Sequence, residues 1–141
     1  MRFWDSSALV PLIVEQATSV RTDGWLADDP VMVIWTLTPV EIASAMQRLV
    51  REGALSEKDA HLAEARTDEL ARACHVIFNL EAVQSQARRL LRLHPLRAAD
   101  ALQLAAALEW AKGKPSGRTF ITLDKQLAWA ASREGFTVLP D

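Results

Sequence analysis

The chain has 141 residues, of which 50% are hydrophobic, and a formal net charge of −2. This length and apolar content are typical of one compact domain with its own core, here spanning residues 1–141. No apolar run approaches the roughly 18 residues that suggest a membrane span, and Asp5 interrupts the region where a signal peptide would be apolar. The single cysteine, Cys74, excludes an internal disulfide and argues against a thiolate-rich zinc site. We therefore expect a cytoplasmic protein without a membrane segment.

Short apolar runs alternate with amphipathic stretches along the chain. In chain order, the pattern predicts a strand over 2–4, a helix over about 6–15, a helix within 17–28, a strand over 31–37, a helix over about 39–52, a helix over about 56–73, a strand over 75–80, helices over about 81–93 and 97–112, a strand over 118–123, a helix over about 124–133 and a strand over 136–140. The strands are continuous apolar runs separated by helices, which is typical of a parallel sheet buried on both faces. We therefore predict a three-layer α/β/α sandwich with a mainly parallel central sheet.

Four carboxylates occupy the ends of predicted strands or the starts of predicted helices. Asp5 ends the first strand, Glu41 lies in the first turn of the helix after the second strand, and Asp124 directly follows the fourth strand. Asp100 lies near the start of the otherwise apolar helix in "RAADALQLAAAL". In parallel α/β sheets, ligands bind beyond the carboxyl ends of the strands. We therefore expect the four acids to meet at this edge of the sheet.

Each of three acids also has a purely structural explanation. Asp5 and Asp124 are suited to be helix N-caps, because aspartate is among the residues preferred there. The segment "TPVE" has the pattern of a capping box, with Thr38 as the N-cap and Glu41 reaching back to its backbone. Taken one at a time, these acids do not require a functional explanation.

Asp100 is the hardest acid to explain structurally. It could pair with Arg97 one turn earlier, but its alanine and leucine neighbours predict a helix packed on most sides. A carboxylate in such a place is costly unless it is paired or bound to a metal. Several carboxylates in one pocket also raise each other's pKa values, and a hard cation such as Mg²⁺ or Mn²⁺ removes that penalty. Such a site suits metal-assisted hydrolysis of a phosphodiester.

The sequence resembles the PIN-domain ribonucleases and, more narrowly, the VapC-type toxins of bacterial toxin–antitoxin pairs. The resemblance is carried by "DSSALV", "TPVEIASAM", "LRAADALQLAAAL" and "FITLDKQLAWAASREGFTVL", which contain the four acids in order and extend over nearly the whole chain. The first two segments are weak signals alone, whereas all four together are specific. The resemblance implies a PIN-like fold, Mg²⁺- or Mn²⁺-dependent cleavage of single-stranded RNA, a homodimer, and a separate antitoxin protein that blocks the site.

Carried over by position, the resemblance implies that Asp5, Glu41 and Asp100 are metal ligands. It implies that Asp124 is a fourth catalytic acid, acting on the metal directly or through water.

The same resemblance implies that the hydroxyl groups of Ser7 and Thr122 orient the acids or a water molecule. Four arginines lie in "RRLLRLHPLR", where the alternatives are a solvated helix face and a phosphate-binding rim. Arg97 is the best candidate for RNA binding, because it lies one helical turn from Asp100.

Other functions remain open at this point. The same fold could serve RNA maturation outside a toxin system, or a non-catalytic binding or regulatory module. A receiver-like domain would need two adjacent acids after the first strand, and a haloacid-dehalogenase-type phosphatase would need Asp-x-Asp there, but the sequence is "DSS". The histidines have no ligand spacing, so we predict surface or packing roles for His61, His75 and His94.

Overall fold

The computed structural model describes residues 1–141. Five strands and seven helices follow one another as β1 (Arg2–Trp4), α1 (Ser6–Ile13), α2 (Ser19–Asp28), β2 (Met32–Trp35), α3 (Thr38–Arg51), α4 (Glu57–Ala73), β3 (His75–Ile77), α5 (Leu80–Leu93), α6 (Ala98–Trp110), β4 (Thr119–Ile121), α7 (Lys125–Glu134) and β5 (Thr137–Leu139). Every element predicted from the sequence is present, although most of the strands are shorter than predicted.

The largest error in the predicted elements concerns the third strand, which was expected to run to residue 80. It ends at Ile77, because the side chain of Asn79 accepts a hydrogen bond from the backbone N–H of Ala82 and begins helix α5. Phe78 and Leu80, which gave the segment its strand-like composition, are exposed. An apolar run therefore continues past the strand without being part of the sheet.

The five strands form one parallel sheet in the order β3-β2-β1-β4-β5. Strand β1 is at the centre, and Phe3 pairs with Val33 of β2 on one side and Phe120 of β4 on the other. The strand order reverses at β1, since the chain first builds outward through β2 and β3 and later returns to add β4. Binding sites of open α/β sheets lie at such reversal points, beyond the carboxyl ends of the strands. Asp5 is located at this point.

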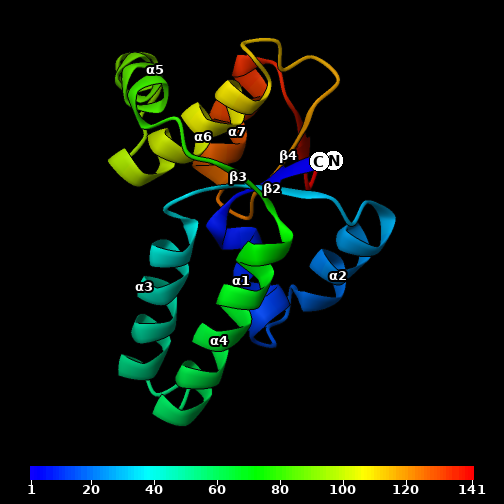
Figure 1. Ribbon diagram of the computed structural model, residues 1–141, viewed down its shortest axis with the longest axis vertical. Helices are drawn as coiled ribbons and strands as arrows, with labels where there is room; N and C mark the ends of the chain where they lie inside the picture. The colour runs from blue at the N-terminus through cyan, green and yellow to red at the C-terminus, as the bar shows by residue number, and fades with distance from the viewer.

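Helices cover both faces of the sheet (Figure 1): α1 to α4 lie on one face and α5 to α7 on the other. Successive strand residues point to opposite faces, so Phe3 joins the core beneath α5, α6 and α7, whereas Trp4 joins the core beneath α1, α3 and α4. The predicted three-layer α/β/α sandwich is confirmed. None of its helices combines the length and the apolar character that crossing a lipid bilayer requires.

Helix α6 is a core helix that carries one of the four acids at its start. Seven of its residues are buried, and all of them are alanine or leucine except Gln103, which is 0% exposed. A helix that is apolar nearly all round is buried on most sides. Asp100, in its first turn, is therefore held by a rigid element packed into the interior.

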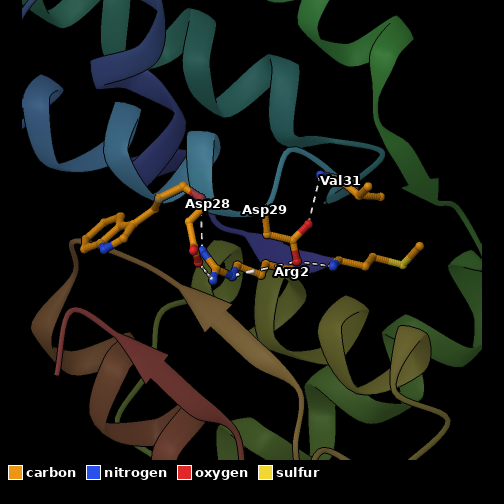
Figure 2. Close-up of polar contacts among 6 residues, drawn as sticks. Arg2, Asp28, Asp29 and Val31 are labelled. Atoms are coloured by element: carbon orange, nitrogen blue, oxygen red, sulfur yellow. Dashed lines mark hydrogen bonds and ion pairs between the residues drawn. The ribbon is translucent and has the colours of Figure 1, made fainter.

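The opposite edge of the sheet, at the amino ends of the strands, is closed by ionic contacts (Figure 2). The Arg2 guanidinium donates to the backbone carbonyl of Trp25 at 3.0 Å and forms an ion pair with Asp28, both at the C-terminal end of α2. A cation is favourable at a helix C-terminus, where unpaired carbonyl groups collect. Asp29 then accepts from the backbone N–H of Val31 at 3.1 Å, which fixes the entry into β2.

Candidate active site

Asp5 is the most deeply buried of the four acids, with 3% of its surface exposed. It follows β1, and its carboxylate caps α1 by accepting from the Ser7 backbone N–H at 3.2 Å. The oxygen that accepts this bond, Oδ2, also accepts hydrogen bonds from the Ser7 hydroxyl at 2.5 Å and from the Thr122 hydroxyl at 2.9 Å. Burial raises the pKa of Asp5, and the hydrogen bonds from Ser7 and Thr122 oppose that rise. The capping prediction is confirmed, but a cap alone requires neither this burial nor three donors on one oxygen.

The two hydroxyl groups also connect Asp5 to the segment after β4. Ser7 Oγ accepts from the backbone N–H of Leu123 at 2.9 Å, and Thr122 Oγ1 accepts from the backbone N–H of Asp124 at 3.1 Å. The two hydroxyl oxygens are themselves 3.2 Å apart. Ser7 and Thr122 therefore fix the positions of the first and fourth acids relative to each other.

The capping-box prediction for "TPVE" is wrong. Helix α3 begins at Thr38 after Leu37, and no side chain caps it. Instead the Thr38 hydroxyl accepts from the amide nitrogen of Gln103 at 3.1 Å, and that nitrogen also donates to Glu41 Oε1 at 3.0 Å. Gln103 is more than 60 positions away in the sequence, so a tertiary contact replaces the predicted local hydrogen bonds of a capping box.

Glu41 is held on its other side by Ser6. The Ser6 hydroxyl lies 3.0 Å from Glu41 Oε2 and 3.3 Å from Asp5 Oδ1. Burial raises the pKa of Glu41 to about 7, with a further contribution from the negative charge of Asp5; hydrogen bonds from Ser6 and Gln103 act in the opposite direction. At neutral pH this carboxyl group therefore exchanges readily between its two protonation states.

Asp100 is half-buried in the first turn of α6 and forms no ion pair with Arg97, so the pairing considered from the sequence does not form. Burial raises the pKa of Asp100, and the negative charges of Asp124 and Asp5 raise it further. The backbone N–H and the charge of Arg97 oppose this rise. The structure thus brings Asp100 into the field of two other acids.

Asp124 is exposed and is the N-cap of α7, where its Oδ1 accepts from the backbone N–H of Leu127 at 2.8 Å. Its predicted capping role is confirmed. Its second carboxylate oxygen makes no hydrogen bond within the chain. The negative charge of Asp124 raises the pKa of Asp100, so the two acids interact electrostatically.

The four acids form one electrostatic group without forming a closed metal cage. Asp5 raises the pKa values of Glu41 and Asp100, and Asp124 raises that of Asp100. No three acidic, histidine or cysteine side chains are close enough to form a ready-made metal-binding cluster. The available ligands are carboxylate and hydroxyl oxygens, which suit a hard cation, and mutual repulsion is relieved when such a cation binds. Mg²⁺ commonly keeps several waters and uses one or two carboxylates, so the donor set fits a partly hydrated ion.

A cavity of about 680 Å³ adjoins Ser6 and Glu41. The residues that line it come mainly from α1, from α3, from the segment that precedes α2 and from the start of α6. Arg48 and Arg97 are among them. Neither guanidinium forms an ion pair or a hydrogen bond within the protein. Two unpaired cations and the Glu41 carboxyl group thus line the same cavity.

The chain is similar to known proteins in both sequence and fold. Residues 2–131 match the PIN domain family. This chain belongs to the PIN domain family. This chain is 30% identical over 139 residues to Ribonuclease VapC45 of Mycobacterium tuberculosis strain CDC 1551 / Oshkosh. It is equally similar to Ribonuclease VapC49 of strain ATCC 25618 / H37Rv. Each alignment covers 98% of this chain and 94% of the relative, which confirms the predicted resemblance to VapC-type PIN domains.

Solved structures share the fold of this PIN domain. FitAcB from Neisseria gonorrhoeae superposes with a TM-score of 0.66 at 17% identity, covering 98% of this chain and 96% of the other. FitAB bound to an IR36 DNA fragment gives 0.64 at 19% identity, with coverages of 99% and 94%. PAE2754 from Pyrobaculum aerophilum gives 0.61 at 21% identity, with coverages of 98% and 88%. The parallel sheet with helices on both faces is thus common to these proteins.

Three side chains at the site of this PIN domain were not singled out from the sequence: Ser6, Arg48 and Gln103. Arg48 follows Glu41 by two helical turns, a spacing that puts both on one face of α3. Gln103 follows Asp100 by one turn of an otherwise apolar helix. Helical spacing from a candidate acid was therefore the signal that could have identified both.

The histidines and the cysteine of this PIN domain lie outside the site. His94 is buried, with Nε2 2.7 Å from Glu134 Oε1 and its ring edge-on to Trp129. His61 and His75 are exposed. Burial raises the pKa of the Cys74 thiol to about 11, so it is not a reactive thiolate at neutral pH. The predicted surface and packing roles of the histidines are confirmed.

Proposed function

We propose that this chain is an endoribonuclease that cleaves single-stranded RNA with Mg²⁺ or Mn²⁺ and acts as the toxin of a toxin–antitoxin pair. The observation that carries the proposal is that hydroxyl groups link Asp5 to Glu41 through Ser6 and to the Asp124 backbone through Thr122, at the strand-order reversal. The raised pKa of Asp100, to which the charges of Asp5 and Asp124 contribute, supports it. The names of the two relatives, both Ribonuclease VapC, support the same activity.

In this proposal Asp5, Glu41 and Asp100 hold a partly hydrated metal ion, directly or through its bound waters, and Asp124 acts on it directly or through a bound water. The bound ion would lower the pKa of a water nucleophile and stabilise the leaving oxygen of the phosphodiester. The protein contributes orientation, because catalytic groups must be held close to their productive geometry. Ser7 and Thr122 hold Asp5, while Ser6 and Gln103 hold Glu41.

The cavity beside the acids is the proposed path of the RNA backbone. A single strand is bound largely through its phosphates, by cations that line a groove. Arg48 and Arg97 are available for this role because neither is used in an internal ion pair. They reach the cavity from different elements, α3 and the segment before α6, so a bound strand would contact both sides.

We further propose that the chain forms a homodimer and binds a separate antitoxin protein that blocks the site. Exposed apolar side chains at the start of α5, those of Phe78 and Leu80, support a protein-binding surface there. An exposed apolar surface of this kind commonly marks an interaction site.

The direct test is cleavage of single-stranded RNA by the purified protein in Mg²⁺, Mn²⁺ or EDTA, beside Asp100→Asn. Cleavage that needs the metal and is lost in a folded Asp100→Asn protein is the expected result. A folded wild type that neither binds Mn²⁺ nor cuts RNA would instead favour a non-catalytic binding module. Growth arrest on expression, relieved by the antitoxin, would separate a toxin from an RNA-maturation enzyme with the same chemistry.

A further inference from the structure

Gln103 is a fully buried amide in a helix whose other buried residues are all alanine or leucine. Its Nε2 uses one hydrogen on Thr38 Oγ1, at 3.1 Å, and the other on Glu41 Oε1, at 3.0 Å. Its Oε1 is buried and has no hydrogen-bond partner. A long polar side chain is thus only half satisfied in the middle of the core.

The orientation of the amide is determined by Glu41. Both groups that face the amide nitrogen are oxygens, and an ionised carboxylate can only accept. Turning the amide over would place its carbonyl oxygen against that carboxylate. The amide orientation that donates to Glu41 therefore leaves Gln103 Oε1 without a hydrogen-bond donor. Such a state is unfavourable for a buried carbonyl group.

Core packing does not require this amide. Methionine has nearly the same length and would fill the same space without an unpaired oxygen. A polar group that lowers stability without a packing advantage is expected chiefly where function requires it.

We propose that Gln103 is a positioning residue, whose amide holds the ionised Glu41 carboxylate beside Asp5 and thereby sets the affinity of the acid site for a divalent cation. The inference rests on the proposed function, because it takes Glu41 to be a metal ligand. Groups that orient a metal ligand without contacting the metal typically contribute a factor of about 10 to 100 in metal affinity.

The experiment compares the wild type with Gln103→Met and with the double variant Thr38→Val, Gln103→Met. The double variant removes both ends of the buried Thr38–Gln103 contact, so no hydroxyl is left without its partner. Mn²⁺ affinity is measured from the free Mn²⁺ signal in electron paramagnetic resonance, and stability is measured by urea unfolding in EDTA. Leu104→Met is the matched control, because Leu104 is buried in the same helix and has no polar contact with Glu41.

We expect both Gln103 variants to raise the dissociation constant for Mn²⁺ about tenfold, with RNA cleavage recovering as Mn²⁺ is increased. The double variant should unfold at no lower urea concentration than the wild type, and Leu104→Met should keep the wild-type Mn²⁺ affinity. A purely structural amide would give the reverse: lower stability in the double variant and unchanged Mn²⁺ affinity.

Three results would overturn the assignment. If Leu104→Met weakens Mn²⁺ binding as much as Gln103→Met, the effect comes from packing of α6 and the positioning role is wrong. If the wild type binds Mn²⁺ and Gln103→Met binds it equally well, the role of Gln103 fails while the proposed function stands. A wild type that binds no Mn²⁺ would overturn both.

Discussion

Asp5, at the end of β1, and Glu41, in the first turn of α3, face each other across the single hydroxyl group of Ser6. The oxygen of that hydroxyl lies 3.3 Å from Asp5 Oδ1 and 3.0 Å from Glu41 Oε2. Burial and the negative charge of Asp5 raise the pKa of Glu41 to about 7, and the hydrogen bond from Ser6 opposes that rise. Glu41 is therefore the acid of this pair that takes up a proton near neutral pH.

The metal-free protein should become more stable as the pH falls from 8 to about 6. The folded-state pKa of Glu41 is raised, so the folded chain binds this proton at a pH where the unfolded chain does not. The free energy of unfolding therefore rises as the pH falls through 7, and the gain is complete near the ordinary carboxyl pKa of about 4.3. Urea unfolding in EDTA at several pH values measures the effect.

Glu41→Gln is the control for this pH dependence. It keeps the shape of the side chain but cannot titrate, so its stability should change less between pH 6 and 8. A stability that is independent of pH in the wild type would contradict the raised pKa.

Binding of Mn²⁺ should release protons at pH 6.5 and progressively fewer as the pH approaches 8.5. Metal ligands must be deprotonated, and a carboxyl group with a pKa of about 7 is largely protonated at the lower pH. Isothermal titration calorimetry in two buffers with different ionisation enthalpies gives the number of protons released. An observed heat that is the same in both buffers at pH 6.5 would exclude Glu41 as a ligand that titrates in this range.

Arg48→Ala should weaken RNA binding without changing the chemical step. Arg48 lines the cavity beside Glu41 but is not among the acids, so we expect KM to rise about five- to tenfold at low salt with kcat nearly unchanged. Arg51→Ala is the matched control, because Arg51 is exposed on the same helix and is not part of the cavity lining. Equal effects of the two substitutions would indicate a general charge effect and remove Arg48 from the binding path.

Asp124 allows its capping and catalytic roles to be separated. Asn is as good an N-cap as Asp, so Asp124→Asn should leave the free energy of unfolding within about 0.5 kcal/mol of the wild type, whereas Asp124→Ala should lower it by about 1 kcal/mol. Both variants remove the negative charge and should lower RNA cleavage. If Asp124→Asn cleaves RNA like the wild type, Asp124 is only a helix cap.

Much of the fold was predictable because the relevant signals are local. Continuous apolar runs predicted a buried parallel sheet, and Asp5 and Asp124 were correctly identified as helix caps. The local signals failed where distant residues compete for the same group. Glu41 looked like part of a capping box, but it bonds to Ser6 and to Gln103, which lie on two other helices.

The prediction of the site was limited for the same reason. The positions of the acids followed from strand order, which a parallel sheet imposes. Three features of the site depend on how α1, α3 and α6 pack together: the burial of Asp5, the unpaired oxygen of Gln103 and the cavity beside Arg48. The residue pattern within one helix does not predict how three helices pack. Phe78 was predicted to belong to the third strand because it is apolar, but it is an exposed residue beyond the end of that strand.

The central place of β1 in the sheet determines when the site can assemble. The Thr122 hydroxyl that holds Asp5 lies 117 positions later in the chain, so it is synthesised long after Asp5. Glu41 similarly accepts a hydrogen bond from Gln103, which is 62 positions later in the chain. Contacts of such wide sequence separation form late, so a nascent chain cannot assemble the four acids until α6 and β4 have been synthesised. A chain that ends before α6 and β4 therefore lacks the contacts that hold Asp5 and Glu41 in place.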